Sequence, residues 1–197
     1  DSCRHNRTKP GRAIRSGFLA LQELPASLCP APCFDDVKTA GADAAVLTTP
    51  ESIAWAFNFR GSDVPHTPIS LAFAILQQNG AAQIFIDQTR LEEDLVRQLD
   101  GLAEVRSPDA FAPSLGELSG QKVLIDPAWC AQAIEIALNA GGAQIVIGAD
   151  PCLLPKATKN PVEQEGARIA HVRDGGAMVK FLRWLETEAP SGDVTEI

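Results

Sequence analysis

Short apolar runs recur along the chain from residue 44 onward, separated by segments with helical periodicity or turn-forming residues. The clearest runs cover 44–48, 69–76, 83–86, 122–125 and 143–147. Runs of this length are typical of buried strands and are far shorter than the roughly 20 residues of a membrane-spanning helix. Strands and helices that alternate at this rhythm pack into a layered α/β domain, in which helices lie over a largely buried sheet.

Turn-forming residues indicate where these elements begin and end. Asn79-Gly80 separates two apolar runs, which predicts a hairpin and therefore an antiparallel strand pair within the sheet. Thr49 and Pro50 predict the N-cap and the first residue of a helix. Further helices are expected to end before Gly41 and to cover 89–99, 109–118 and 128–140, with an edge strand over 103–106.

Residues 1–34 differ in composition from the rest of the chain. They hold five of the 17 Lys and Arg residues but two of the 25 Asp and Glu residues. They show no sustained helical or strand period, and Pro25, Pro30 and Pro32 interrupt any helix. Two interpretations stay open: an irregular linker from a preceding domain, or a segment that is not native to this fold. Residues 35–150 are expected to form the α/β domain.

The acidic balance of the chain limits its partners. The net charge is −8, which argues against nucleic-acid binding because such binding needs basic surface. Neither a GxGxxG nor a GxxxxGK[ST] motif occurs, so the sequence gives no support for nucleotide binding. The chain opens on a polar stretch with no apolar segment of the kind found in signal peptides. We therefore expect a cytoplasmic protein with no membrane segment.

The five cysteines do not form a recognisable framework. Their number is odd and no CxxC pair occurs, so a disulfide scaffold is not indicated. Cys29 and Cys33 have the spacing of half a metal site, but no His or Cys follows them at zinc spacing. Cys130 and Cys152 lie among apolar residues and are predicted to be small core side chains. This usage agrees with a reducing compartment.

A connector over 151–159 precedes the longest predicted helix. Asn160 is a suitable N-cap, Pro161 suits the first helical position, and Glu163 completes a capping box. The apolar stripe of this helix needs a partner surface, and little sequence follows it. We therefore expect residues 160–197 to be the first helix of a further, truncated domain. The stripe comprises Ile169, Val172, Met178, Phe181, Leu182 and Leu185.

The stretch 51–68, ESIAWAFNFRGSDVPHTP, combines an apolar helical turn with a polar loop. The loop carries Arg60, Asp63 and His66 among turn-forming residues, a composition that is typical of binding loops. In one interpretation it borders a substrate-binding mouth or a subunit interface. In the other, Arg60 pairs with Asp63 to fix a turn at Gly61 while His66 hydrogen-bonds the backbone. Trp55 and Trp184 are predicted core aromatics.

Two stretches resemble a known family. The pattern W-x-x-N-x-R-G-S-D-V-x-H-x-P, from Trp55 to Pro68, resembles the second N-terminal domain of long-form Xaa-Pro aminopeptidases (aminopeptidase P). The stretch KATKNPVEQEGARIAHVRDGGAMVKFLRWLETEAPSGDVTEI, over 156–197, resembles the linker and first helix of the family's catalytic domain. The resemblance covers 35–197. It implies a creatinase N-terminal, ribonuclease H-like fold: a mixed sheet with helices on both faces, followed by a long helix from a truncated "pita-bread" domain.

The resemblance also implies an activity. Members of the family remove the N-terminal residue from peptides whose second residue is proline. Their catalytic domain binds two divalent cations, usually manganese, through two Asp, one His and two Glu, and a bridging hydroxide attacks the scissile carbonyl. In the family order these ligands lie beyond Ile197, so no catalytic or metal-binding residue is expected in this chain, and the chain alone is expected to be inactive. The full-length enzyme is expected to be a homodimer that acts on proline-containing peptides.

His171, Arg173 and Asp174 lie in a conspicuous AHVRDG stretch but do not match the family's catalytic motifs. They are expected to be packing and salt-bridge residues. Two other functions stay open: a C–N hydrolase related to creatine amidinohydrolase, and a non-catalytic protein-binding module of the same architecture. The RGSD loop and the helix that follows 151–159 favour the peptidase.

Overall fold

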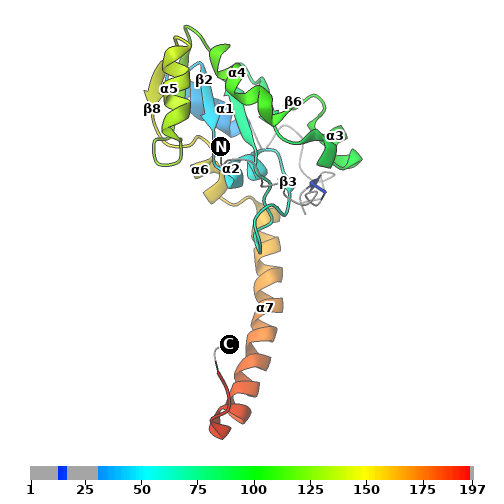
Figure 1. Cartoon of the computed structure of the whole chain (residues 1–197). Helices are drawn as coiled ribbons and strands as arrows, with labels where there is room; N and C mark the ends of the chain where they lie inside the picture. The colour runs from blue at the N-terminus through cyan, green and yellow to red at the C-terminus, as the bar shows by residue number, and fades with distance from the viewer. Residues whose placement is uncertain (1–12, 17–30, 196–197) are drawn as a thin grey trace, which may run out of the picture. The chain divides into compact units, whose positions relative to one another are not determined.

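The computed structural model describes residues 13–16 and 31–195 (Figure 1). The chain divides into two compact units, the first ending at Thr158 and the second beginning at Lys159. Across these described residues no helix is both long and apolar enough to cross a membrane.

One mixed sheet of six strands forms the centre of the first unit, in the order β6-β5-β4-β2-β7-β8. β4 (Phe73–Gln77) runs antiparallel to both of its neighbours, β2 (Ala44–Leu47) and β5 (Ala82–Phe85). The remaining adjacent pairs are parallel. They involve β6 (Glu104–Arg106), β7 (Lys122–Ile125) and β8 (Gln144–Ile147). The predicted mixed α/β sheet is confirmed.

The hairpin between β4 and β5 turns at Asn79-Gly80, as the sequence predicts. Gly80 has φ 93°, a backbone conformation that glycine adopts at little cost. The Asn79 side chain accepts a hydrogen bond from the Ala81 backbone N–H at 3.0 Å, and the Gln77 N–H donates to the Ala81 carbonyl at 2.8 Å. These contacts are local in sequence, which explains why this strand pair can be predicted from the sequence.

Helices cover both faces of the sheet, as predicted (Figure 1). On β2, Leu47 points into a cluster with residues of α2 (Pro50–Ala56) and α3 (Glu93–Leu99), while Val46 points into a cluster with α4 (Phe111–Gly116) and α5 (Gln132–Ala140). α1 (Ala31–Thr39) packs Val37 against Ala45, on the Leu47 side. This alternation follows from the two-residue period of a strand.

Part of the segment predicted to be irregular belongs to the folded unit. α1 begins at Ala31, within the expected linker, because a proline at a helix start loses no hydrogen bond and Pro32 occupies that first turn. β1 (Arg15–Ser16) pairs with β3 (Phe59–Arg60). Fully buried Ile14 donates to the Arg90 carbonyl at 2.7 Å and accepts from Glu92 N–H at 2.9 Å. The remainder of 1–30 lies outside the described residues.

Two helix starts differ from the predictions, and two short elements were not predicted. The helix expected over 89–99 begins at Glu93, after a 3-10 turn η1 (Gln88–Arg90). The helix expected from 128 begins at Gln132, because Asp126 accepts hydrogen bonds from the backbone of Ala128 and Asp150 and holds the intervening residues in turns. The connector contains an unpredicted helix, α6 (Leu153–Ala157). A second 3-10 turn, η2 (Pro108–Ala110), precedes α4.

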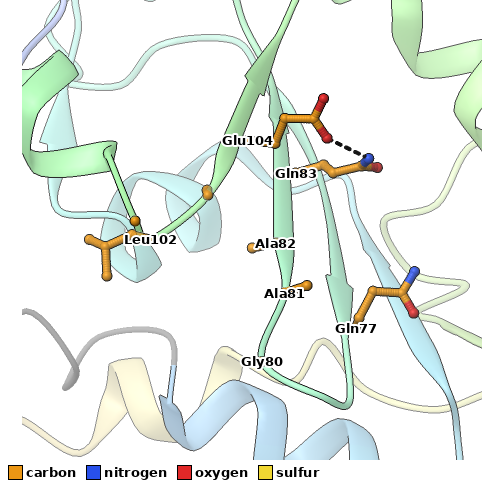
Figure 2. Close-up of a pocket in the computed structure, with 9 residues that line it drawn as sticks. Gln77, Gly80, Ala81, Ala82, Gln83, Leu102 and Glu104 are labelled. Carbon is orange, nitrogen blue, oxygen red and sulfur yellow. Dashed lines mark hydrogen bonds between the residues drawn. The ribbon is translucent and has the colours of Figure 1, made fainter.

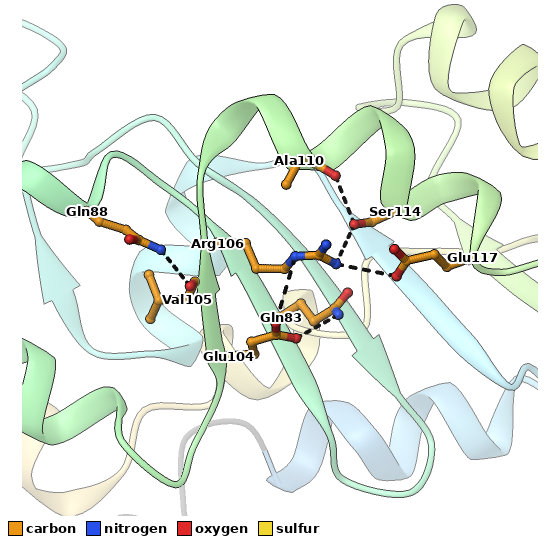
Figure 3. Close-up of polar contacts among 8 residues, drawn as sticks. All are labelled: Gln83, Gln88, Glu104, Val105, Arg106, Ala110, Ser114 and Glu117. Atoms are coloured by element: carbon orange, nitrogen blue, oxygen red, sulfur yellow. Dashed lines mark hydrogen bonds and ion pairs between the residues drawn. The ribbon is translucent and has the colours of Figure 1, made fainter.

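The two edges of the sheet differ. At the β6 edge, the Gln88 side chain donates to the outward-facing Val105 carbonyl at 2.7 Å (Figure 3). At the β8 edge, Gln144 and Gly148 bond to β7, so Ile145 and Ile147 face outward and make no backbone hydrogen bond with a described residue. The Ile147 side chain is 60% exposed. Among the described residues, a side chain therefore occupies the β6 edge and none occupies the β8 edge.

Arg106 ties the β6 edge to α4 (Figure 3). Its guanidinium donates to Ser114 Oγ at 2.8 Å and to Glu117 at 3.4 Å, and it lies 5.8 Å from the centre of the Phe85 ring. The Arg106 side chain is one-quarter exposed. These contacts anchor a three-residue edge strand that has few packing residues of its own.

The second unit consists of α7 (Pro161–Glu188) and the short turn η3 (Ala189–Ser191). The predicted capping box is present: Asn160 Oδ1 accepts from Glu163 N–H, and the Glu163 carboxylate accepts from Asn160 N–H, both at 2.9 Å. No residue of α7 is buried. Trp184 is half exposed, so its prediction as a core aromatic is wrong here, whereas Trp55 packs partly buried against the core of the first unit.

The AHVRDG residues of α7 are surface side chains. Arg173 Nε donates to Asp174 Oδ1 at 3.1 Å, which confirms the expected salt bridge. The His171 Nδ1 atom lies 2.8 Å from the Ala167 carbonyl oxygen, within the same helix. All three side chains are exposed, so the packing role expected of them is wrong for this structure.

Candidate functional site

The candidate site is the loop over 57–71, between α2 and β4. Phe57 and Phe59 are almost fully buried and anchor its start in the core. Asn58 between them has φ 47°, a left-handed conformation that asparagine tolerates better than most residues. These two buried phenylalanine side chains fix the position at which the polar part of the loop begins after α2.

Asp63 is the hub of this loop. Its carboxylate forms an ion pair with the Arg90 guanidinium, with Nη1 at 3.1 Å, and also accepts from Ser70 Oγ at 2.7 Å and Leu71 N–H at 2.9 Å. The Asp63 and Arg90 side chains are 12% and 16% exposed. The loop is thereby joined to η1 and to the approach to β4.

Arg60 does not pair with Asp63, so the predicted ion pair is wrong. Its Nη1 atom donates to the Ala54 carbonyl at 3.1 Å and to the Phe59 carbonyl at 2.8 Å. Carbonyls near a helix C-terminus lack intrahelical partners and bind cationic side chains favourably. Arg60 therefore stabilises the end of α2. The ion pair with Asp63 that the sequence predicted for Arg60 is formed by Arg90 instead.

The environment of Asp63 lowers its pKa. Partial burial by itself raises the pKa of this carboxyl group, but hydrogen bonds from Arg90, Ser70 and Leu71 and the positive charge of Arg90 favour the ionised form and outweigh it. Asp63 is therefore an anion at neutral pH. With its oxygens used by these donors, it serves to position the loop.

Gly61 allows the two arms of the loop to approach closely. A Cβ atom at this position would lie 2.6 Å from Ser70 Cβ and 3.0 Å from the Ile69 carbonyl oxygen. The Asp63 N–H donates to that same carbonyl at 3.1 Å. The glycine therefore serves a close backbone approach that brings Ser70 within reach of Asp63.

His66 lies at the exposed part of the loop, with φ 63°. The predicted hydrogen bond from its ring to the backbone is wrong, since in the part of the chain that the structure describes the ring makes none. A non-glycine residue with positive φ costs conformational energy, and histidine is among the residue types that accept it. Of Arg60, Asp63 and His66, the histidine is the one with an exposed side chain.

Sequence reasoning missed Arg90 and Ser70 as members of this site. Arg90 is 27 positions from Asp63 and lies in a stretch whose pattern predicts the start of an amphipathic helix. Ser70 opens an apolar run and reads as a strand residue. No local pattern connects either of them to Asp63, because their contact depends on how η1 packs beside the loop.

Metal-binding potential is absent from the described part of the chain, which contains no group of three or more His, Cys, Asp and Glu side chains placed to hold an ion. Cys29 lies outside the described residues. Cys33, which has the spacing of half a metal site with Cys29, is buried against Cys152. Cys152 is a core residue as predicted, whereas the same prediction for Cys130 is wrong, because its side chain is only half-buried. The described residues therefore do not fit a metal centre.

A groove of about 450 Å³ lies beside the β4–β5 turn and the start of β6 (Figure 2). Its side chains are mostly small or neutral, and the one charged residue, Glu104, accepts a hydrogen bond from Gln83 at 3.0 Å. Binding sites usually gather several convergent polar groups, and this groove does not. The loop around Asp63 remains the stronger candidate.

The fold and the loop define the class of protein. Residues 31–163 match the family model for the creatinase/prolidase N-terminal domain, and the chain belongs to that family. Within the family, its sequence is similar to aminopeptidases P. Aminopeptidase P1 of Arabidopsis thaliana is 30% identical over 77% of this chain and 27% of its own length. A probable Xaa-Pro aminopeptidase P of Trichophyton verrucosum is 33% identical over 73% of this chain and 22% of its own length.

Solved structures share the fold. The X-prolyl aminopeptidase of Caenorhabditis elegans, described as a cytosolic enzyme with a di-nuclear active site, superimposes on 95% of this chain with a TM-score of 0.81 and 24% identity. The match covers 31% of that protein. The Xaa-Pro dipeptidase of Bacillus anthracis matches 71% of this chain and 38% of its own, with a TM-score of 0.55 and 18% identity. The chain thus spans roughly a fifth to a third of the length of these aminopeptidase relatives.

Proposed function

We propose that this chain is part of a Xaa-Pro aminopeptidase, which releases the N-terminal residue from peptides with proline in the second position. The observation that carries the proposal is the 30–33% identity to aminopeptidases P over about three-quarters of the chain. The six-stranded sheet and the RGSD loop lie within the matched region. The relatives named above are aminopeptidases P, which favours this proposal over the creatine amidinohydrolase and binding-module alternatives.

The proposal assigns catalysis to a part of the full-length protein outside this chain. The described residues do not fit a metal centre, so no hydrolytic step is derived from them. The di-nuclear site of the C. elegans relative supports two divalent cations, for which we propose manganese, in the full-length enzyme. By itself, this chain is expected to release no amino acid from a Xaa-Pro peptide.

The first unit, in this proposal, supports a loop that borders the substrate mouth or the subunit interface. Asp63 and Arg60 hold the loop through internal contacts, which leaves exposed His66 to meet the peptide or the neighbouring protein surface. Loops that are fixed on a rigid scaffold commonly carry binding residues. His66 is therefore the residue of this chain that we place closest to substrate.

The second unit, in this proposal, is the first helix of the catalytic domain. Val172 is 79% exposed and Phe181 is 50% exposed, and apolar side chains of a long helix need a surface to pack against. The remaining length of the aminopeptidase relatives is large enough to supply that surface. We further propose a cytoplasmic homodimer, supported by the cytosolic C. elegans relative for the compartment alone.

The test is an aminopeptidase assay on the product of the complete reading frame and on this 197-residue chain. Each purified protein is incubated with Mn²⁺ and the tripeptide Ala-Pro-Ala, and free alanine is measured. The full-length protein is expected to release alanine and to stop when a chelator is added. The 197-residue chain is expected to release none.

Two controls separate the possible outcomes. Ala-Ala-Ala tests the requirement for proline, and creatine tests the alternative hydrolase. Release of alanine by the 197-residue chain would contradict the proposal that the metal ligands lie outside this chain. Creatine hydrolysis by the full-length protein, or a failure to cleave Ala-Pro-Ala, would contradict the aminopeptidase assignment itself.

A further inference from the structure

Two cysteines from distant parts of the sequence face each other in the core of the first unit. Cys33 lies in the first turn of α1, and Cys152 lies immediately before α6, 119 positions later. Both side chains are fully buried, in the same apolar cluster as Leu47 and Ile53. Fold geometry, and not sequence proximity, brings them together.

The two sulfur atoms are in direct contact. Cys33 Sγ donates a hydrogen bond to Cys152 Sγ at 2.9 Å, which exceeds the length of a disulfide bond by about 0.85 Å. The contact requires no rearrangement of the elements that carry the two residues.

The backbone around Cys152 is fixed by further contacts. Its N–H donates to Asp150 Oδ1 at 2.8 Å, and the Asp150 N–H donates to Asp126 Oδ2 at 2.9 Å. On the other side, Val37 packs α1 against Ala45 and Leu124 of the sheet. The folded unit therefore holds the two thiols at this separation.

Metal binding is a poor explanation for the pair. A thiolate metal site needs three or four ligands, and among residues 13–16 and 31–195 no third His, Cys, Asp or Glu joins a group that can hold an ion. A buried pair of thiols in direct contact matches the chemistry of a dithiol that can be oxidised.

We propose that Cys33 and Cys152 are a redox pair that forms a disulfide when the protein folds in the presence of a small-molecule disulfide such as oxidised glutathione. One cysteine thiolate attacks a glutathione sulfur and displaces one glutathione thiolate. The second cysteine then attacks the mixed disulfide and displaces the other. The two cysteine sulfurs are oxidised, one oxidised glutathione is reduced, and the two protons pass to the two glutathione thiols.

The closed pair joins the start of α1 to the end of the first unit. Because the bond closes a long loop, it reduces the freedom of the unfolded chain and stabilises the folded unit. Exchange is expected to be slow in the folded protein. A hydrogen bond with Cys33, together with burial, raises the pKa of Cys152 well above its ordinary value, and the thiolate is the reactive form.

The test uses a variant that keeps only this pair: Cys3→Ser, Cys29→Ser and Cys130→Ser. It is refolded with a mixture of oxidised and reduced glutathione, and a second sample is refolded with dithiothreitol. After quenching at low pH, free thiols are counted by alkylation in denaturant, and a non-reducing digest is analysed by mass spectrometry. Thermal unfolding is followed by circular dichroism.

The oxidised sample is expected to have no free thiol, a peptide that links Cys33 to Cys152, and a midpoint about 10 °C above that of the reduced sample. Adding Cys33→Ser is expected to abolish the link and the shift. Two free thiols after refolding with oxidised glutathione, or a glutathione adduct that never resolves, would overturn the proposal. In the wild-type chain, a link from Cys33 to Cys29 in place of Cys152 would overturn it as well.

Discussion

The Asp63 carboxylate makes the ion pair and several of the hydrogen bonds that hold the RGSD loop. It receives hydrogen bonds from two side chains and one backbone N–H, and its side chain is 12% exposed. A carboxylate in this setting contributes far more to the folding stability than an exposed one. Its removal leaves the polar groups that were oriented toward it without a hydrogen-bond acceptor. The stability of the loop is therefore expected to depend on this single charge.

Asp63→Asn is expected to lower the free energy of unfolding by about 3 kcal/mol at pH 7, since the amide keeps the shape but removes the charge that Arg90 contacts. Urea denaturation followed by circular dichroism measures the change. Asp94→Asn is the matched control, because the ion pair of Asp94 with Arg97 is exposed and exposed pairs contribute little. Equal effects of the two substitutions would contradict the role given to Asp63.

The lowered pKa of Asp63 gives this contribution a pH dependence of known sign. A group with a depressed pKa in the folded state stabilises the fold above its unfolded pKa, about 3.9 for aspartate, and loses that contribution as the pH falls through the folded value. The stability difference between wild type and Asp63→Asn is therefore expected to be full at pH 7 and to shrink below about pH 4. Urea titrations at pH 7, 5 and 3 test this, and a difference that grows toward low pH would contradict it.

At the scale of elements, α7 depends on its first turn. No residue of this helix is buried, so tertiary packing within the described residues contributes little to it. Two adjacent glycines, Gly175 and Gly176, lie in its interior, and each costs up to about 1 kcal/mol relative to alanine. The capping box at Asn160 and Glu163 compensates for part of this cost.

Asn160→Ala is expected to lower the stability of α7 by about 1 kcal/mol, because the Glu163 N–H loses its acceptor. Hydrogen exchange of the amides in 162–168 measures it, with exchange expected about fivefold faster. Asn160→Asp is the matched control, since aspartate caps as well as asparagine and its charge favours a helix N-terminus. Faster exchange in both variants would show that the cap hydrogen bond is not the cause.

Elements with local signals could be predicted from the sequence. The Asn79-Gly80 hairpin, the capping box at Asn160 and the strand over 44–48 are all specified by neighbouring residues. The pairing of Asp63 with Arg90 could not be predicted, because it joins segments whose contact depends on the whole fold. The start of α5 was misplaced for a similar reason: Asp126 bonds the backbone of Asp150, 24 positions away.

At the scale of the whole protein, His66 is where the proposed aminopeptidase role can be tested through this chain. In the full-length enzyme, His66→Asn is expected to raise KM for Ala-Pro-Ala about threefold to tenfold and to leave kcat nearly unchanged, as loss of a binding contact does. Asparagine tolerates the positive φ of this position, so the loop backbone is retained.

Glu93→Gln serves as the control for this measurement, because Glu93 is almost fully exposed on α3. It is expected to change neither parameter. If His66→Asn alters kcat with KM constant, His66 does not act through binding. If neither parameter changes, the loop does not reach the substrate.

The unequal edges of the sheet limit how copies of this protein can associate. Pairing of β8 with β8 of a second copy would be isologous and would use up the open edge of both. At the far edge of this sheet Gln88 already donates to the Val105 carbonyl, so a strand added there would have to displace that donor. Among the described strands of the six-stranded sheet, edge-to-edge addition is therefore favoured at β8 over β6, and pairing of β8 with β8 occupies the favoured edge of both copies.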